Sequence, residues 1–426
     1  MSPTATLPML RDPLDPDVVE RSGVGEGEPE ILRTSRRRAA ERAAQEPWPT
    51  GEEEEWRRFP PKDIPAGPLM GATTTATYSQ QGLPKGVWVG DLGLAARERP
   101  ELVAEWLDRG DSIPTHAAIT ALADAMWSAG TFVYVPPGVT VEEPIVWTRH
   151  WAAGAAACLS RTIVVADRGS AVTVVEDVTS DGGSAGRVAV PHLEIHAAGD
   201  ANVRYVHLQR YGDDVWDLGA QWYGSERGSV LSSFNVLLGS ARTKLGVISD
   251  IRGDGAEVKL YGLVAAGGTQ RIDVNSFQRL DGKASQSDLL YLSALYDSAK
   301  AVYYGLIRVE PTSSMTGSYQ ECRNLLLSDK AGAHPIPVLE ILTNDVARCG
   351  HGATAGRIQE DEVFYVMTRG IDRRTAEQLL VRGSFARVLD RIPNTAIRAR
   401  VLEALRPRIG GVAELEREAL EKELVA

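Results

Sequence analysis

Three residues in the C-terminal part of the sequence are candidates for metal or thiol chemistry. Cys349 and His351 stand one residue apart in the stretch CGHGATAGRIQEDEVFYVMTRGI (349–371), and Cys322 lies upstream. Thiolate sulfur and imidazole nitrogen are ligands of zinc and of iron–sulfur clusters. Three scattered cysteines cannot supply a four-cysteine site, so a cluster here would be shared with another subunit or completed by histidine. A structural turn leading into a helix is the alternative interpretation.

A second pair of histidines does not predict a metal site. His192 and His196 have H-x3-H spacing, but the surrounding PHLEIHA alternates apolar and polar residues as a strand does. At roughly 3.3 Å per residue, a strand separates the two side chains by about 13 Å, too far to share one ion. We expect structural or solvent-facing roles for both, and Cys158 is expected to be a small buried apolar residue.

The sequence carries no motif for the common catalytic chemistries. It has neither a G-x-S-x-G serine elbow nor a G-x-x-x-x-G-K-[ST] phosphate loop, so we expect a non-enzyme that does not itself hydrolyse ATP. The net charge of −11 disfavours nucleic acid and anionic membranes as main partners. No secretory signal or apolar run of membrane-spanning length is recognisable, and the three cysteines exclude a disulfide framework. We therefore expect a soluble, cytoplasmic protein.

Composition divides the chain into four parts. Residues 1–30 are rich in Pro, Gly, Asp and Glu and are expected to be disordered. Residues 31–130 are predicted to form a helical region, and residues 348–426 a C-terminal helical domain. Between them, residues 131–347 contain about a dozen short runs of Val, Ile, Thr, Tyr and Leu, separated by turns such as DRGS, AGDA and RGDG.

The β-rich part fits either two β-sandwiches or a β-solenoid whose coils stack on one another. No strict repeat is visible, so periodicity alone does not choose between them. A solenoid needs covered ends, which the helical segments on either side can supply.

The first C-terminal helix is expected near residues 360–369. It has acidic residues in its first turn and Arg369 in its last, and Gly370 can supply a left-handed stop. Val363, Phe364 and Met367 are predicted to form its apolar face.

Four stretches resemble segments of the SufB/SufD family of iron–sulfur cluster assembly proteins. The stretch 349–371 resembles the signature near the C-terminus of the family's SufD branch, and it is the most specific of the four. The others are EPWPTGEEEEWRRF (46–59), WSAGTFVYVPPGVTVEEPI (127–145) and YQECRNLLLSDKAGAHPIPVLEI (319–341). Together they span most of residues 45–395.

The resemblance implies a mainly β fold in which a right-handed parallel β-helix is flanked by an N-terminal helical region and a C-terminal helical domain. It also implies partners. A SufD chain pairs with SufB through the β-helices, and its C-terminal helices bind SufC, an ABC-type ATPase, so no phosphate loop is needed here. Such an assembly is a scaffold on which a transient iron–sulfur cluster forms, with sulfur reaching it indirectly from a cysteine desulfurase or sulfur carrier. No permanently bound cofactor is expected.

The resemblance also assigns residues. His351 matches the SufD histidine at the interface where the nascent cluster forms, and Cys322 aligns approximately with the essential cysteine of SufB. Cys349 is a weaker ligand candidate. Where SufB reads His-Glu this chain has Gly352 after the histidine, which favours SufD.

Docking of SufC is expected to involve four residues of the first C-terminal helix and its end: Phe364, Tyr365, Arg369 and Gly370.

Three alternatives remain open. The chain could pair with itself and SufC without SufB, or it could be a purely architectural subunit without cluster chemistry. A β-solenoid carbohydrate-active enzyme is a remote third, because no groove with paired carboxylates and no export signal is recognisable.

Overall fold

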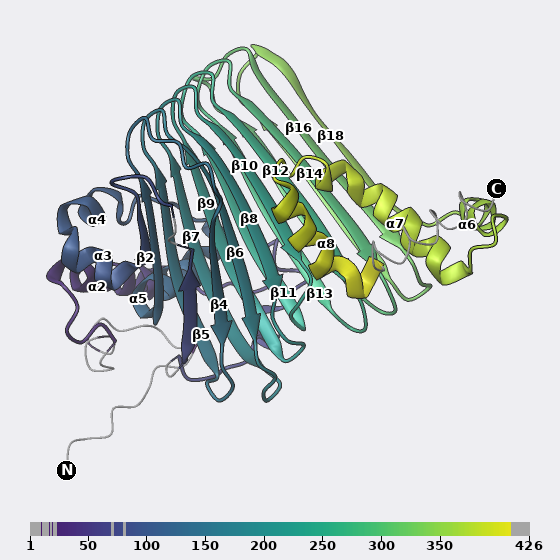
Figure 1. Ribbon diagram of the computed structural model, residues 1–426, viewed down its shortest axis with the longest axis horizontal. Coiled ribbons are helices and arrows are strands. Elements are labelled where there is room, and N and C mark those ends of the chain that lie inside the picture. The colour runs from purple at the N-terminus through teal and green to yellow at the C-terminus, as the bar shows by residue number, and fades with distance from the viewer. Residues whose placement is uncertain are drawn as a thin grey trace.

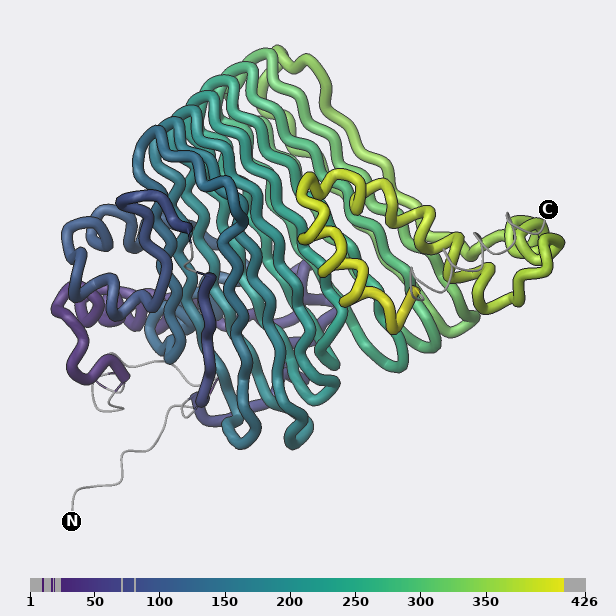
Figure 2. Tube along the Cα trace, in the orientation of Figure 1, coloured from purple at the N-terminus to yellow at the C-terminus, as the bar shows by residue number. Residues whose placement is uncertain are grey.

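A long stack of parallel β-coils forms the centre of the molecule (Figures 1 and 2). This computed structural model describes residues 10, 17, 19, 24–69, 72–79 and 82–409. Within them, two nine-stranded sheets face each other, and successive strands alternate between the sheets from β3 onward. The predicted β-solenoid is therefore confirmed, and the two-sandwich alternative is wrong.

We name each sheet after the strands at its two edges. The β1–β18 sheet contains β1 (Thr74–Tyr78), β4 (Ile145–Trp151), β6 (Ala171–Ser180), β8 (Asn202–Arg210), β10 (Val230–Leu237), β12 (Glu257–Ala266), β14 (Gln286–Leu295), β16 (Thr316–Leu326) and β18 (Val346–Arg357). The β2–β17 sheet contains β2 (Trp88–Asp91), β3 (Ala129–Val135), β5 (Ala157–Ala166), β7 (Arg187–Ala197), β9 (Val215–Ser225), β11 (Arg242–Ile251), β13 (Arg271–Leu280), β15 (Lys300–Val309) and β17 (Gly332–Ile341). All neighbouring strands run parallel except β1 with β4 and β2 with β3.

Alternation along the strands fills both the lumen and the outer faces. In β12, Val258 and Leu260 point into the lumen, whereas Tyr261 and Leu263 belong to the layer under the C-terminal helices. Each fully buried Val or Leu contributes about 1.5–3 kcal/mol. Because both faces of such a strand are buried, its sequence is a nearly continuous run of apolar residues.

The N-terminal helices cover the outer face of the β2–β17 sheet at its N-terminal part (Figure 1). They are α2 (Glu30–Gln45), α3 (Leu92–Glu98), α4 (Pro100–Trp106) and α5 (Ala117–Met126), with short 3-10 turns at Pro61–Asp63 and Pro114–His116. Helix α5 packs on β5 and β7, and α2 packs on α5. None of the described helices is long and apolar enough to cross a membrane.

The C-terminal helices lie on the other sheet. Helices α7 (Arg373–Leu389) and α8 (Thr395–Ile409) pack across β12 and β14, while α6 (Glu360–Met367) lies beyond them (Figure 1). The expected boundary of the helical domain at residue 348 differs from the structure, because β18 carries the solenoid to Arg357. Most of residues 1–23, which belong to the segment expected to be disordered, and residues 410–426 of the expected helical domain lie outside the described residues.

A buried ion-pair network holds the N-terminal helices on the solenoid. Arg161 of β5 is 1% exposed, and its guanidinium contacts Glu194 of β7 at 2.8 Å and Asp108, which follows α4, at 2.9 Å. Asp124 of α5 accepts from His192 of β7 at 2.6 Å. Burial raises the pKa of Glu194, but the charge of Arg161 outweighs it and holds that pKa well below its ordinary value. The Glu194 carboxylate therefore stays ionised in the interior.

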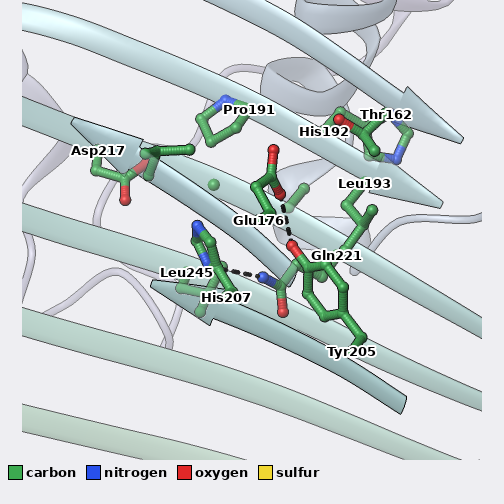
Figure 3. Close-up of a pocket in the computed structure, with 13 residues that line it drawn as sticks. Thr162, Glu176, Pro191, His192, Leu193, Tyr205, His207, Asp217, Gln221 and Leu245 are labelled. Carbon is green, nitrogen blue, oxygen red and sulfur yellow. Dashed lines mark hydrogen bonds between the residues drawn. The ribbon is translucent and has the colours of Figure 1, made fainter. Parts of the chain in front are cut away.

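A second polar group lies inside the lumen (Figure 3). Glu176 accepts from the Tyr205 hydroxyl at 2.6 Å and pairs with Arg149 at 3.0 Å. A small cavity adjoins this group. The volume that the centre of a water molecule can occupy in it is about 20 Å³, which is enough for about one water. Asp217 borders the same space and has a single hydrogen-bond donor, the amide of Gln209 at 3.0 Å. Burial raises the pKa of Asp217 to about 7.

Removal of Arg161 should destabilise the chain strongly. Arg161→Met leaves Glu194 and Asp124 buried without their main counter-charge, so we expect a loss of about 3–5 kcal/mol in the free energy of unfolding. Urea unfolding followed by tryptophan fluorescence measures it. The exposed Arg168→Met is the control and should change stability by less than about 0.5 kcal/mol. Equal midpoints for the two variants would contradict the role of the network.

The pKa of Asp217 predicts a stability that falls as pH rises. Its folded-state pKa of about 7 exceeds the unfolded value near 3.9, so the stabilisation is complete below about pH 4 and is lost as pH rises through about 7. The slope should approach about 1.4 kcal/mol per pH unit. Asp217→Asn should flatten the profile in denaturant titrations between pH 5 and 8, whereas the exposed Asp213→Asn should not. A flat wild-type profile would show that Asp217 is ionised throughout.

Candidate functional site

The candidate site lies at the end of the solenoid remote from the N-terminal helices (Figure 1). Strands β17 and β18 are the last members of their sheets, and within the described residues no strand pairs with their outer edges. The side chains on the lumen side of these strands therefore meet no further coil. Ile341, the last residue of β17, and Leu342 after it are each 42% exposed.

The register of β16 and β18 places all three predicted ligand residues on the lumen side. Cys322 belongs to the lumen core and lies opposite Ala353 of β18. Residues two apart in a strand share a face, so His351 points to the same side as Ala353. Cys349, a further two residues back, packs against the lumen core. The stretch that could have been only a turn into a helix is thus a strand.

The three residues differ in accessibility. His351 is exposed, Cys349 is half-buried and Cys322 is only 2% exposed, beneath the terminal coil. Burial raises the pKa of Cys322 to about 12, although its sulfur accepts from the Asn324 amide at 3.4 Å. Burial also raises the pKa of Cys349. Both side chains are therefore thiols at neutral pH, and metal binding to either would have to displace a proton.

These residues do not form a complete metal site within the described chain. Cys322 and His351 are diagonal neighbours on adjacent strands, and Cys349 lies further along. Among the described residues, one group of three or more His, Cys, Asp or Glu side chains has all its ligand atoms within 4.8 Å of one another, and it consists of Asp124, His192 and Glu194. That group is the network described above, in which Arg161 already provides the positive charge. At the open end, any ion would need ligands from another molecule.

The residue after His351 is constrained by its neighbour strand. A β-carbon placed on Gly352 would come within 3.0 Å of the Tyr319 hydroxyl of β16. A larger residue here would therefore require Tyr319 to move.

Helix α6 exposes an aromatic surface beside the open end. Val363 is its only buried residue, whereas Phe364 and Tyr365 are 68% and 62% exposed. The guanidinium of Arg369 lies 3.9 Å from the centre of the Tyr365 ring, and Gly370 ends the segment with a φ of +79°. The left-handed stop is confirmed, but of the expected apolar face only Val363 is buried, whereas Phe364 and Met367 are exposed.

Sequence reasoning missed the buried ion pairs. A charged residue inside an apolar strand is the sequence signal that could have predicted these pairs. It occurs at Arg161, Glu194 and Lys244. The structural roles predicted for the two histidines are confirmed. His192 bonds Asp124, and His196 packs between Trp106 and Trp222.

Comparison with known proteins identifies the family. Residues 149–384 match the family model described as SUF system FeS cluster assembly, SufBD core domain, and residues 70–146 match the SufBD protein N-terminal region. The iron-sulfur cluster assembly protein SufD of Bacillus subtilis is 28% identical over 346 residues, which are 78% of this chain and 76% of the relative.

Two further relatives are named as SufBD family proteins of iron-sulfur cluster assembly. The one from Synechocystis is 26% identical over 74% of this chain and 67% of its own. The chloroplastic one from Arabidopsis thaliana is 26% identical over 76% of this chain and 60% of its own. The core match alone covers more than half of the sequence, and it runs from within β4 along the solenoid to β18 and on through α6 into α7. The chain therefore belongs to the SufB/SufD family of iron–sulfur cluster assembly proteins.

Proposed function

We propose that this chain is a SufD-like scaffold subunit that pairs with a SufB-like subunit through the open end of the solenoid. The observation that carries the proposal is the terminal coil, which pairs with no further strand among the described residues and has the exposed imidazole of His351 on its lumen side. Pairing at this end would bring ligands from the second subunit to His351. The chain itself performs no catalytic step.

Iron and sulfide are the cargo of this site. The imidazole of His351 is the ligand that needs no rearrangement of the chain, because it is already exposed. Cys349 is half-buried and Cys322 is covered, so either thiol would join only after the terminal coil moves, and metal binding would then release the thiol proton to solvent. Sulfur would arrive from a cysteine desulfurase or sulfur carrier, and the cluster would be transient.

Helix α6 and its end are the docking site for an ABC-type ATPase of the SufC kind. Phe364 and Tyr365 are adjacent aromatic side chains, and each is more than half exposed to solvent. Aromatic side chains that become buried between subunits dominate the energetics of protein interfaces, so this exposed pair favours a docking site. The ATPase would supply the nucleotide chemistry for which this chain has no phosphate loop. We place the whole assembly in the cytoplasm, with no nucleic acid or membrane partner.

Replacement of His351 should lower cluster loading without breaking the complex. We expect His351→Ala, purified anaerobically from its own host, to retain its partners but to carry several-fold less iron and sulfide than the wild type. Native mass and metal and sulfide analysis measure this, with the exposed His334→Ala of β17 as the matched control. Unchanged loading in His351→Ala would make the chain a purely architectural subunit. A wild-type complex of two copies with the ATPase would instead support self-pairing.

Charge on the exposed surface of α6 should abolish ATPase docking. Phe364→Asp and Tyr365→Asp each remove an aromatic contact and bury a carboxylate, so affinity should fall by at least about 100-fold. Thermal unfolding should be unchanged because neither side chain packs in the chain's own core. The control is Glu377→Lys on α7, and binding is measured by titration with the purified ATPase. Retained affinity in the folded Asp variants would overturn the docking assignment.

A further inference from the structure

A polar cavity lies where helices α2 and α5 meet the solenoid, at the end remote from β18 (Figure 1). The volume that the centre of a water molecule can occupy in it is about 130 Å³, whereas one water needs only about 10–15 Å³. Its polar lining comes from α2 and the residue after it, the loop after α4, α5 and β7, and it includes Arg42, Glu46, Asp111, Ser112, Asp124 and His192. The cavity is therefore large enough for a small organic molecule.

The imidazole of His192 has an acceptor atom that nothing in the chain uses. Asp124 and His192 are the most buried of these charged and titratable lining residues, at 3% and 4% exposed. Asp124 accepts a hydrogen bond from Nδ1 of His192 at 2.6 Å, and in a neutral ring Nε2 is then an acceptor. Nε2 is buried and has no hydrogen-bond partner among the described residues. A buried acceptor without a donor costs free energy, and a donating ligand would remove that cost.

The ion pairs beside the cavity contain more carboxylates than cations. Arg161 contacts Asp108 at 2.9 Å and Glu194 at 2.8 Å. It also lies 3.5 Å from Asp124, which Arg42 contacts at 3.0 Å. Three carboxylates thus share two guanidinium groups in this part of the described chain. A further positive charge in the cavity would balance the third carboxylate.

Two more carboxylates, those of Glu46 and Asp111, line the cavity and are exposed to solvent. The acceptors around the cavity are too far apart for a metal ion. The one described group with three ligand atoms within 4.8 Å of one another needs Glu194, which does not line the cavity. Separated acceptors suit a cation that carries several N–H donors, and an ammonium group has three.

We propose that this cavity binds a small molecule with a primary ammonium group, which a short alkylamine or a free amino acid can supply. The ammonium group donates to Nε2 of His192 and is attracted by the carboxylates of Glu46 and Asp111. In an amino acid, the carboxylate also pairs with the guanidinium of Arg42. Because α2, α5 and β7 all line the cavity, the ligand holds the N-terminal helices on the solenoid. The inference is independent of the proposed function, which concerns the opposite end of the solenoid.

Calorimetric titration of the purified chain with four small probes tests the inference. The probes are propylamine, alanine, propionate and tetramethylammonium, which has the charge of an ammonium group but no N–H. Propylamine and alanine should bind with dissociation constants of about 0.1–10 mM, as expected for ligands with so few atoms. Propionate and tetramethylammonium should bind at least about tenfold more weakly, because neither donates an N–H. Alanine binding tighter than propylamine identifies an amino acid as the source of the ammonium group, and alanine binding no tighter identifies a simple amine.

Matched variants show whether the probes occupy this cavity. Ala117→Leu on α5 fills the cavity without changing a charge, so it should weaken propylamine binding at least about tenfold. The control is Ala104→Leu on the exposed side of α4, which should stay within about twofold of the wild type. Asp111→Asn should weaken binding by about two- to fivefold, whereas the distant and equally exposed Asp213→Asn should not. Thermal unfolding without probe shows whether each variant is folded.

Three results would overturn the inference. They are no binding of either propylamine or alanine, binding of tetramethylammonium as tight as that of propylamine, and undiminished binding in both folded variants, Ala117→Leu and Asp111→Asn. None of these results bears on subunit pairing at the open end, so the inference and the proposed function can fail separately.

Discussion

The structure depends on one constraint, that every backbone N–H and C=O in a parallel solenoid bonds to the next coil, so only the two ends have unpaired edges. At the N-terminal end the stack finishes in two short antiparallel strands, β1 and β2, beside helices that cover the neighbouring face. At the other end it stops at two long strands with nothing beyond them among the described residues. The difference between the two ends is the structural basis for the proposed pairing surface.

Charges hold the rest of the chain around this stack. The interior ion pairs of Arg161 tie the N-terminal helices to β5 and β7, and Arg400 of α8 reaches Asp177 of β6 at 2.6 Å on the opposite sheet. Glu321 of β16 binds Arg387 of α7 at 2.8 Å near the open end. The helices are thereby fixed to the outer faces of the sheets, and within the described part of the chain no strand pairs with the outer edges of β17 and β18. Helix α6 is held less closely, since only Val363 is buried.

Much of the architecture follows from the sequence because the central strands are long apolar runs rich in Val, Ile and Tyr. The runs at 162–166, 202–208 and 257–264 lie within β5, β8 and β12. Strand β18 was missed because Gly and Ala have low strand propensity, so GHGATAG reads as a turn. Its ladder with β16 overrides that preference.

The same misassignment hid the geometry of the candidate site. Only once β18 is a strand does register show that His351, Cys349 and Cys322 share the lumen side. The burial of Cys322 could not be predicted, because it depends on the coil that follows it in the chain. The Arg161 network joins residues from four separate elements, and single-sequence periodicity carries no information on such distant pairs.

The central claim is that the open end of the solenoid is a subunit interface of a cluster-assembly complex. Photo-cross-linking in the native host tests it most directly, with a light-activated amino acid at position 351 and, separately, at exposed Arg168 on the side of the solenoid. The account predicts that position 351 captures a second SufB/SufD-family chain, identified by mass spectrometry, and that position 168 does not. Capture of no family chain from position 351, or equal capture from both positions, would contradict it.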